Sequence, residues 1–228
     1  MTRSTVSLPL TSHTSSNNSR VRWIVIFVLA LWFALSFALG ASGAFINRLG
    51  TPPLALLAAV MVPTALFLAA YWISRSFHEF VLAADVSLLT ATQSWRFAGV
   101  GFIALNLLGF LPSYFAWPAG LGDMAIGVTA PWVALALGRN ARFASSKTFV
   151  AWNVFGIFDF AVLAVGMGAI APLIFPNLLH AITPQMVTAA PMRHLPLSMV
   201  PSFLVPMFTI FHLVALFQGA PVHAPKSI

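Results

Sequence analysis

The chain has 228 residues, of which 60% are hydrophobic and only 7% are charged, and its formal net charge is +7 at pH 7. A soluble domain carries about 25% charged residues, so this composition excludes a soluble protein with a polar surface. The basic residues lie between apolar runs, where they act as topology signals, and we expect no nucleic-acid partner. The absence of cysteine excludes disulfides, thiolate metal sites and cysteine nucleophiles.

The first 20 residues are rich in Ser, Thr and Asn, and we expect this cytoplasmic leader to be disordered because it offers little apolar surface for packing. The first apolar run follows over residues 23–44. A signal peptide cleaved near the sequence ALGASGA is the alternative interpretation of this run. The run is longer than the hydrophobic region of a signal peptide, about 7–15 residues, which favours a retained helix.

A helix needs about 20 mostly apolar residues to cross a bilayer. Five further runs of about this length follow the first along the chain. We therefore predict an all-α polytopic membrane protein, with a six-helix transmembrane domain over residues 21–220 and a cytoplasmic tail over residues 221–228. The predicted spans are residues 23–44, 53–74, 97–116, 118–138, 148–170 and 198–218.

The basic residues predict the direction in which the chain crosses the membrane. With a cytoplasmic N-terminus, all 11 Lys and Arg residues except Arg48 and Arg193 fall on the cytoplasmic side, Arg96 among them. Positive residues accumulate in cytoplasmic loops, so this bias predicts an even number of spans and two cytoplasmic termini. The small size of the chain and the absence of other targeting signals favour the inner membrane of a bacterium.

Two connections are expected to carry structure of their own. Residues 76–95 place apolar side chains on one helical face, which predicts either a helix in the membrane interface or a cytoplasmic extension of the third span. Residues 171–196, on the outer side, are interrupted by prolines, which excludes one continuous helix. We expect a structured lid or re-entrant stretch there, with a short helix at residues 177–182.

Small residues alternate with polar ones at helical spacing in the last four spans, a pattern typical of close helix contacts. We therefore expect spans three to six to form the central bundle. Asp159 and Asn106 lie close to the membrane midplane, with Thr209 and His212 about one to two turns toward the cytoplasm. A midplane carboxylate indicates a functional site, so these four residues are the candidate ligand-binding or proton-coupling group. A purely structural hydrogen bond between a protonated Asp159 and Asn106 is the alternative.

Asp123 lies only about one and a half turns below the predicted outer surface. It can pair there with Arg193, with His194 or with N–H groups at the start of its own helix, since helix N-termini favour anions. The second interpretation is an outer vestibule for a solute, formed by Asp123, Arg193 and His194.

The sequence GLGD at Gly120–Asp123 resembles the GxGD signature of intramembrane aspartyl proteases, which implies Asp159 as a second acid. The resemblance covers four residues, and the rest of the chain does not follow that family. The predicted depths of the two carboxylates differ by about 9 Å, whereas a proton-sharing pair needs near contact. We therefore do not expect a protease.

The sequence offers no other catalytic signature. It has no phosphate loop, dinucleotide fingerprint, zincin motif or serine triad, and the spans hold only His212, whereas a haem needs a pair of axial ligands. We expect no metal and no cofactor, and rank an enzyme third. The first hypothesis is a lipid-embedded protein that binds or transports a small solute or ion through the midplane site, with or without proton coupling. The alternative is a non-catalytic accessory or scaffold subunit with a protein partner or a second copy.

Overall fold

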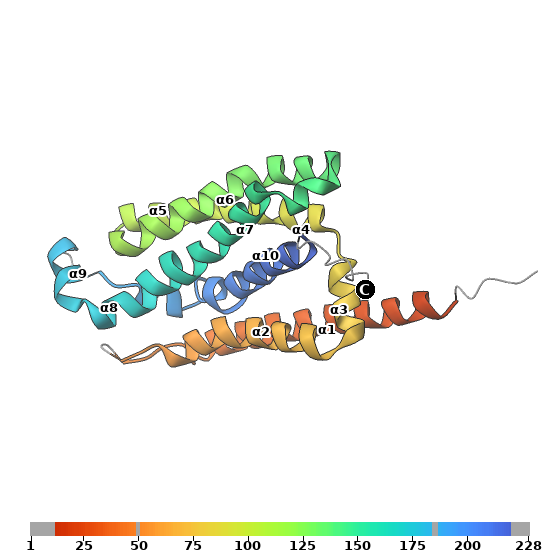
Figure 1. Ribbon diagram of the computed structural model, residues 1–228. Helices are drawn as coiled ribbons and strands as arrows, with labels where there is room; N and C mark the ends of the chain where they lie inside the picture. The colour runs from red at the N-terminus through yellow and green to blue at the C-terminus, as the bar shows by residue number, and fades with distance from the viewer. Residues whose placement is uncertain (1–11, 49–50, 184–186, 220–228) are drawn as a thin grey trace, which may run out of the picture.

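The computed structural model describes residues 12–48, 51–183 and 187–219, and these form helices and connections without a strand. The longer helices run lengthwise through one bundle (Figure 1). The elements, in chain order, are α1 (Ser12–Ala41), α2 (Leu54–Ile73), α3 (Arg75–Leu82), α4 (Val86–Thr92), η1 (Gln93–Gly99), α5 (Val100–Leu107), α6 (Ser113–Arg139), η2 (Ala141–Ser145), α7 (Lys147–Phe158), η3 (Asp159–Ile170), α8 (Ala171–Ile174), α9 (Pro176–Ile182), η4 (Ala190–Arg193), η5 (Val200–Leu204) and α10 (Val205–Gly219).

The described residues contain five helices that are long and apolar enough to cross a membrane. They are Ser19–Ala41, Leu54–Ile73, Ser113–Arg139, Lys147–Ile174 and Val200–Gly219. The prediction of a helical membrane protein is confirmed at this level. Helix α1 begins at Ser12, within the predicted leader, where each further residue of the helix adds one backbone hydrogen bond. Residues 1–11 of the leader and the predicted tail, 221–228, lie outside the described residues.

The predicted third span, residues 97–116, is not one helix. Gly109 has a positive φ of 79° and Pro112 precedes the first residue of α6, so the chain turns between residues 108 and 112. Helix α6, which corresponds to the predicted fourth span, accordingly begins at Ser113 rather than at Pro118, and Pro118 lies within it. Apolar residues continue through the turn, and for that reason hydropathy alone did not reveal it.

A helical run of α4, η1 and α5 covers residues 86–107 and packs lengthwise against α6 (Figure 1). Asp85 begins this run, because its side chain accepts a hydrogen bond from the N–H of Leu88 at 3.0 Å. The short helix α3 precedes it and is separate. Residues 86–95 of the connection are therefore an extension of the next long run, which was one of the two predicted alternatives.

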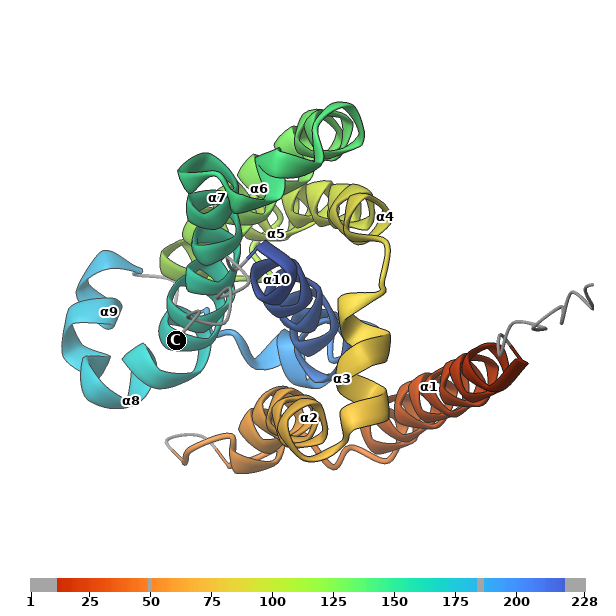
Figure 2. The same cartoon turned by 45° about the vertical axis from the view of Figure 1, so that its right-hand side comes forward.

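Helix α10 lies between the α1–α2 pair and the layer formed by α6 and α7, and it contacts α2, α4 and α7 (Figures 1 and 2). Pro206, near its start, has no N–H, so the carbonyl of Ser202 lacks its usual donor four residues later. Trp32 Nε1 and Ser36 Oγ of α1 both donate to that carbonyl, each at 3.2 Å. The carbonyl that Pro206 leaves without a donor thus binds two side chains of α1.

The connection between α7–η3–α8 and η5 folds into the short helices α9 and η4, and we call it the outer connection after its predicted position. The predicted helix at residues 177–182 is confirmed, since α9 covers Pro176–Ile182. Met192 and Ala189 are buried against Phe102 and Phe115 of the bundle. This segment therefore packs onto one end of the bundle, although residues 184–186 lie outside the described residues.

Candidate functional site

Arg96 lies on η1, near the middle of the helical run 86–107, and is only 3% exposed. Four acceptors surround its guanidinium, all from other elements. Nε donates to Asp123 Oδ1 at 2.7 Å, Nη1 donates to His212 Nε2 at 2.9 Å and to the Gly156 carbonyl at 3.4 Å, and Nη2 donates to Asp159 Oδ2. The ring of Phe160 covers the guanidinium carbon at 3.8 Å. Arg96 therefore occupies the centre of a polar group inside an apolar bundle.

The two carboxylates come from α6 and η3, which pack against each other. Asp123 is 8% exposed and Asp159 is 1% exposed. Gly122 makes their approach possible, because a Cβ at this position would overlap Asp159 Oδ1. That oxygen is buried and has no hydrogen-bond partner among the described residues. One acid is thus fully enclosed, while the other is slightly accessible.

His212 connects the guanidinium to Asn153. A guanidinium can only donate, so His212 Nε2 must accept, and the ring proton must sit on Nδ1. Nδ1 then donates to Asn153 Oδ1 at 2.9 Å, and Asn153 Nδ2 donates to the Phe149 carbonyl at 2.9 Å. This chain of hydrogen bonds requires a neutral imidazole. We call Arg96, Asp123, Asp159, His212 and Asn153 the Arg96 cluster.

The cluster lies well inside the bundle. At 1.5 Å per residue, Asp123 is about 15 Å from the start of α6, and Asp159 is about 18 Å from the start of α7. Both carboxylates bind the guanidinium of Arg96, so the predicted depth difference of about 9 Å between them is wrong. Asp123 lies deeper than expected because α6 begins at Ser113. Both acids bind Arg96 rather than each other, so they do not form the proton-sharing pair of an aspartyl protease.

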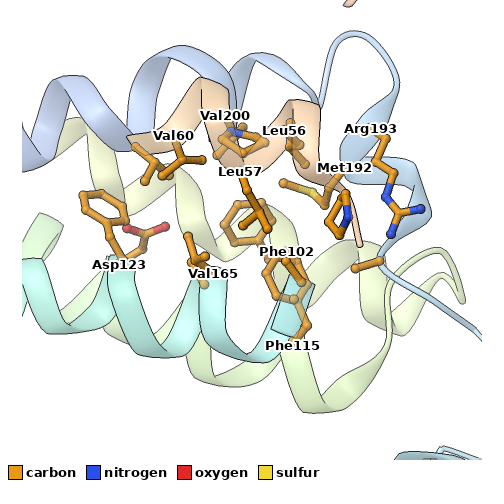
Figure 3. Close-up of a pocket in the computed structure, with 18 residues that line it drawn as sticks. Leu56, Leu57, Val60, Phe102, Phe115, Asp123, Val165, Met192, Arg193 and Val200 are labelled. Atoms are coloured by element: carbon orange, nitrogen blue, oxygen red, sulfur yellow. The ribbon is translucent and has the colours of Figure 1, made fainter. Parts of the chain in front are cut away.

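Two cavities meet at Asp123. The first, about 60 Å³, lies between α2, η3 and the outer connection, with Asp123 at one end and Arg193 at the other (Figure 3). The second, about 160 Å³, lies between η1, α5, η5 and α10 and includes Arg96 in its wall. Phe102, Phe160, Val200 and Val205 line both cavities, which places them side by side. Apart from Asp123, Arg96 and Arg193, nearly all of the lining side chains are apolar.

Arg193 marks the end of the first cavity that lies away from the cluster. Burial lowers the pKa of its guanidinium from the ordinary value, and Tyr114 opposes that change. Because an arginine stays charged even with a lowered pKa, Arg193 contributes a second, separate positive charge to the cavity wall.

The structure brings together some of the predicted site residues and separates others. Asp159 and His212 belong to the Arg96 cluster, and Asp123 joins them. Asn106 does not: it donates to the Leu111 carbonyl at 2.8 Å and accepts from Trp117 Nε1 at 3.0 Å, which holds the turn between α5 and α6. Thr209 donates to the Val205 carbonyl of its own helix at 2.8 Å.

The outer vestibule residues also separate. Asp123 pairs with Arg96 rather than with Arg193 or His194, and His194 is exposed. In addition, Arg96 does not lie at the cytoplasmic boundary, where the topology prediction placed it. Its charge predicts the end of a span, whereas the helical run of α4, η1 and α5 continues on both sides of Arg96. One signal was available in the sequence: two acids in apolar spans need a buried cation as a partner, and Trp95 and Phe97 on either side of Arg96 are apolar.

In the described part of the chain, no three His, Asp or Glu side chains are placed to hold a metal ion. The acids and the histidine of the cluster instead surround Arg96, so the protein supplies its own central cation.

The charges of the Arg96 cluster do not balance. Two carboxylates face one guanidinium and a neutral imidazole, which leaves one negative charge in excess when both acids are ionised.

In a comparison with protein families, a model described as Domain of unknown function (DUF8737) matches residues 52–218. The matched segment contains all five cluster residues and both cavities, whereas α1 lies outside it. Searches of curated proteins and of solved structures gave no match.

Proposed function

The chain belongs to the family described as Domain of unknown function (DUF8737), and we propose that it binds and transports a small solute or ion through the Arg96 cluster, coupled to a proton. The observation that carries this proposal is the excess carboxylate of the cluster. A buried charge without a partner is costly in an apolar medium, so the cluster favours uptake of one proton or one cation. Asp123, which borders both cavities, is the acid that a solute reaches.

We propose six membrane crossings, with α4–η1–α5 as the third. This run of residues 86–107 is about 30 Å or more in length, enough to cross the hydrocarbon core. A charged residue in its middle is compatible with lipid because Asp123, Asp159 and His212 satisfy the guanidinium. With this crossing, the start of α1 and the end of α10 lie at the same end of the bundle (Figure 1).

We further propose that this end faces the cytoplasm of a bacterium. Removing Arg96 from the count of boundary residues weakens the positive bias only slightly, because Arg75, Arg139, Arg142 and Lys147 still lie at this end. Arg48 and Arg193 lie at the opposite end. Pairing of two copies or a partner protein remains compatible with this arrangement.

The test is proton movement in liposomes. The full chain is reconstituted with a pH indicator inside the vesicles, and alkylammonium ions, carboxylates, amino acids, sugars and alkali-metal ions are added in turn under an imposed membrane potential. We expect at least one class to drive proton movement with the parent protein and none to do so with Asp159→Asn. Glu79→Gln removes an exposed carboxylate and is the matched control.

A scaffold predicts a different result. No class would then move protons with the parent protein, and Asp159→Asn would alter only thermal stability or assembly. That result would overturn the proposed transport function.

A further inference from the structure

We infer that the solute is a small apolar organic cation without N–H groups, such as a short alkyltrimethylammonium ion, held with its charge at Asp123. This inference rests on the proposed function and narrows it to one class of solute. The argument has three parts: the sign of the free charge, the number of polar atoms in the walls, and the shape and chemistry of the space.

The sign follows from how the polar atoms of the cluster are used. Arg96 already donates to four protein acceptors, so its guanidinium has little capacity left for an anion. Asp123 uses Oδ1 for Arg96, and the described residues provide no hydrogen bond to its Oδ2. Asp123 borders both cavities. The acceptor that remains is therefore a carboxylate oxygen, and its natural ligand is a cation.

The scarcity of other polar atoms decides which kind of cation fits. An inorganic cation needs several oxygen ligands, and among the described residues Asp123 is the only carboxylate in the wall of either cavity. A primary ammonium carries three N–H donors, and one carboxylate oxygen cannot accept hydrogen bonds from all of them. The remaining donors would be buried without an acceptor, which is costly. A quaternary ammonium has no N–H group to leave unsatisfied. It needs one negative charge and apolar or aromatic surroundings, which these walls provide.

The walls near Asp123 are aromatic. Phe102 and Phe160 line both cavities, Phe115 lines the first, and Trp95 and Phe208 line the second. Aromatic faces attract quaternary ammonium ions through their ring quadrupoles. The second cavity is the larger, at about 160 Å³, which is similar to engineered cavities that hold a benzene molecule. Arg193 lines the first cavity but not the second, and Arg96, which does line the second, is paired with both Asp123 and Asp159.

Gly101 provides a way to test the location without touching a charged group. It lines the second cavity, and a Cβ added there would meet nothing within 4 Å. Gly101→Leu therefore fills the cavity while both carboxylates remain. Gly138 also has open space around its Cβ but lies near the exposed end of α6, so Gly138→Leu is the matched control.

The experiment is a calorimetric titration of the purified full chain with butyltrimethylammonium chloride, compared with sodium chloride, butylammonium chloride and sodium pentanoate. We expect saturable binding of the quaternary ion, weaker binding of butylammonium and none of pentanoate. Asp123→Asn and Gly101→Leu should each weaken binding at least tenfold, whereas Gly138→Leu and Glu79→Gln should leave it unchanged. If Asp123→Asn fails to fold, Gly101→Leu decides the location.

Two results would overturn the inference: pentanoate binding in place of the ammonium ion, or binding that Gly101→Leu and a folded Asp123→Asn leave unchanged. The liposome experiment separates this failure from a failure of the proposed function. If another class of solute drives proton movement that depends on Asp159, transport stands and the quaternary cation is wrong. If no class does so, both fail.

Discussion

Arg96 is buried inside an apolar bundle, where a cation is stable only when all of its charge and donors are paired. Arg96 has a planar fork of donors, and each edge of that fork meets a different helix: Asp123 of α6, Asp159 at the start of η3 and His212 of α10. Each partner depends on the guanidinium, since removing it would leave two buried carboxylates uncompensated. The packing of these three helices at the centre of the bundle therefore depends strongly on the Arg96 side chain.

Replacing Arg96 by Leu should lower the free energy of unfolding by about 3–5 kcal/mol, the cost typical of leaving a buried ion pair without one partner. Arg96→Lys should recover only part of this loss, because an ammonium cannot reach all three partners in one plane. Denaturant titration of the purified protein measures the change. Arg75→Leu breaks an exposed pair with Glu79 and should have no measurable effect. Equal stability of Arg96→Leu and Arg75→Leu would contradict the structural role of Arg96.

Two glycines allow the helices of the cluster to approach each other. A Cβ at Gly122 would overlap Asp159, and a Cβ at Gly156 would overlap His212 Nε2. Alanine is favoured over glycine in a helix by about 1 kcal/mol, so Gly138→Ala, in open space, should stabilise the protein. Gly122→Ala and Gly156→Ala should instead destabilise it by about 1–3 kcal/mol through overpacking. Thermal unfolding of the three variants tests this, and stabilisation by all three would show that the close approach is unnecessary.

At the scale of residues, the sequence predicts Asp159 and His212 as site residues, because such side chains are rare in membrane spans. It does not predict Arg96 or Asn153, which bind them. Hydropathy predicts Arg96 to lie at the boundary of a span, since a hydropathy window ends at a charge and contains no information about a partner in another helix. Asn106 and Asn153 look equivalent in sequence. Only the packing shows that Asn106 closes a turn, whereas Asn153 orients His212.

At the scale of elements, irregular helices determine how the bundle is built. The run of residues 86–107 changes from α-helix to 3₁₀-helix around Arg96, and the chain of α7 continues as a π-helix from Asp159. Irregular turns of this kind are frequent at functional sites, and here they contain Arg96 and Asp159. Hydrophobic periodicity located the long helices well, but it assumes a regular helix and could not reveal these changes or the turn at Gly109.

The attachment of α1 to the Ser202 carbonyl should depend on Pro206. Ser36→Ala removes one of the two donors and should cost about 0.5–1.5 kcal/mol, the net value of a typical hydrogen bond. In a Pro206→Ala background the restored N–H can satisfy the same carbonyl, so Ser36→Ala should cost less. A double-mutant cycle by thermal or denaturant unfolding measures this coupling. Strictly additive effects would indicate that α1 attaches independently of the proline.

At the scale of the whole molecule, four segments bring Arg96, two acids and His212 together, and we propose that the chain crosses the membrane six times. The absence of cysteine makes this arrangement open to direct mapping, because every introduced cysteine is unique. We expect single cysteines at Gly138 and at Ser74 to react with an impermeant maleimide from one side of the membrane. Cysteines at Arg48 and at Gly109 should react only from the other side. Labelling of Ser74 and Gly109 from the same side would contradict the crossing by residues 86–107, and labelling of Gly109 and Gly138 from the same side would contradict the crossing by α6.

The central claim is that the Arg96 cluster has one excess negative charge, which either a proton or a cation neutralises. The most direct test is the affinity for butyltrimethylammonium between about pH 5 and about pH 9, where the quaternary ion keeps its charge and the carboxylates can exchange protons. Competition predicts that affinity falls as the pH falls, approaching a tenfold change per pH unit where the cluster holds a proton. Asp159→Asn should flatten this dependence. An affinity of the parent protein that stays constant across the whole range would contradict the claim.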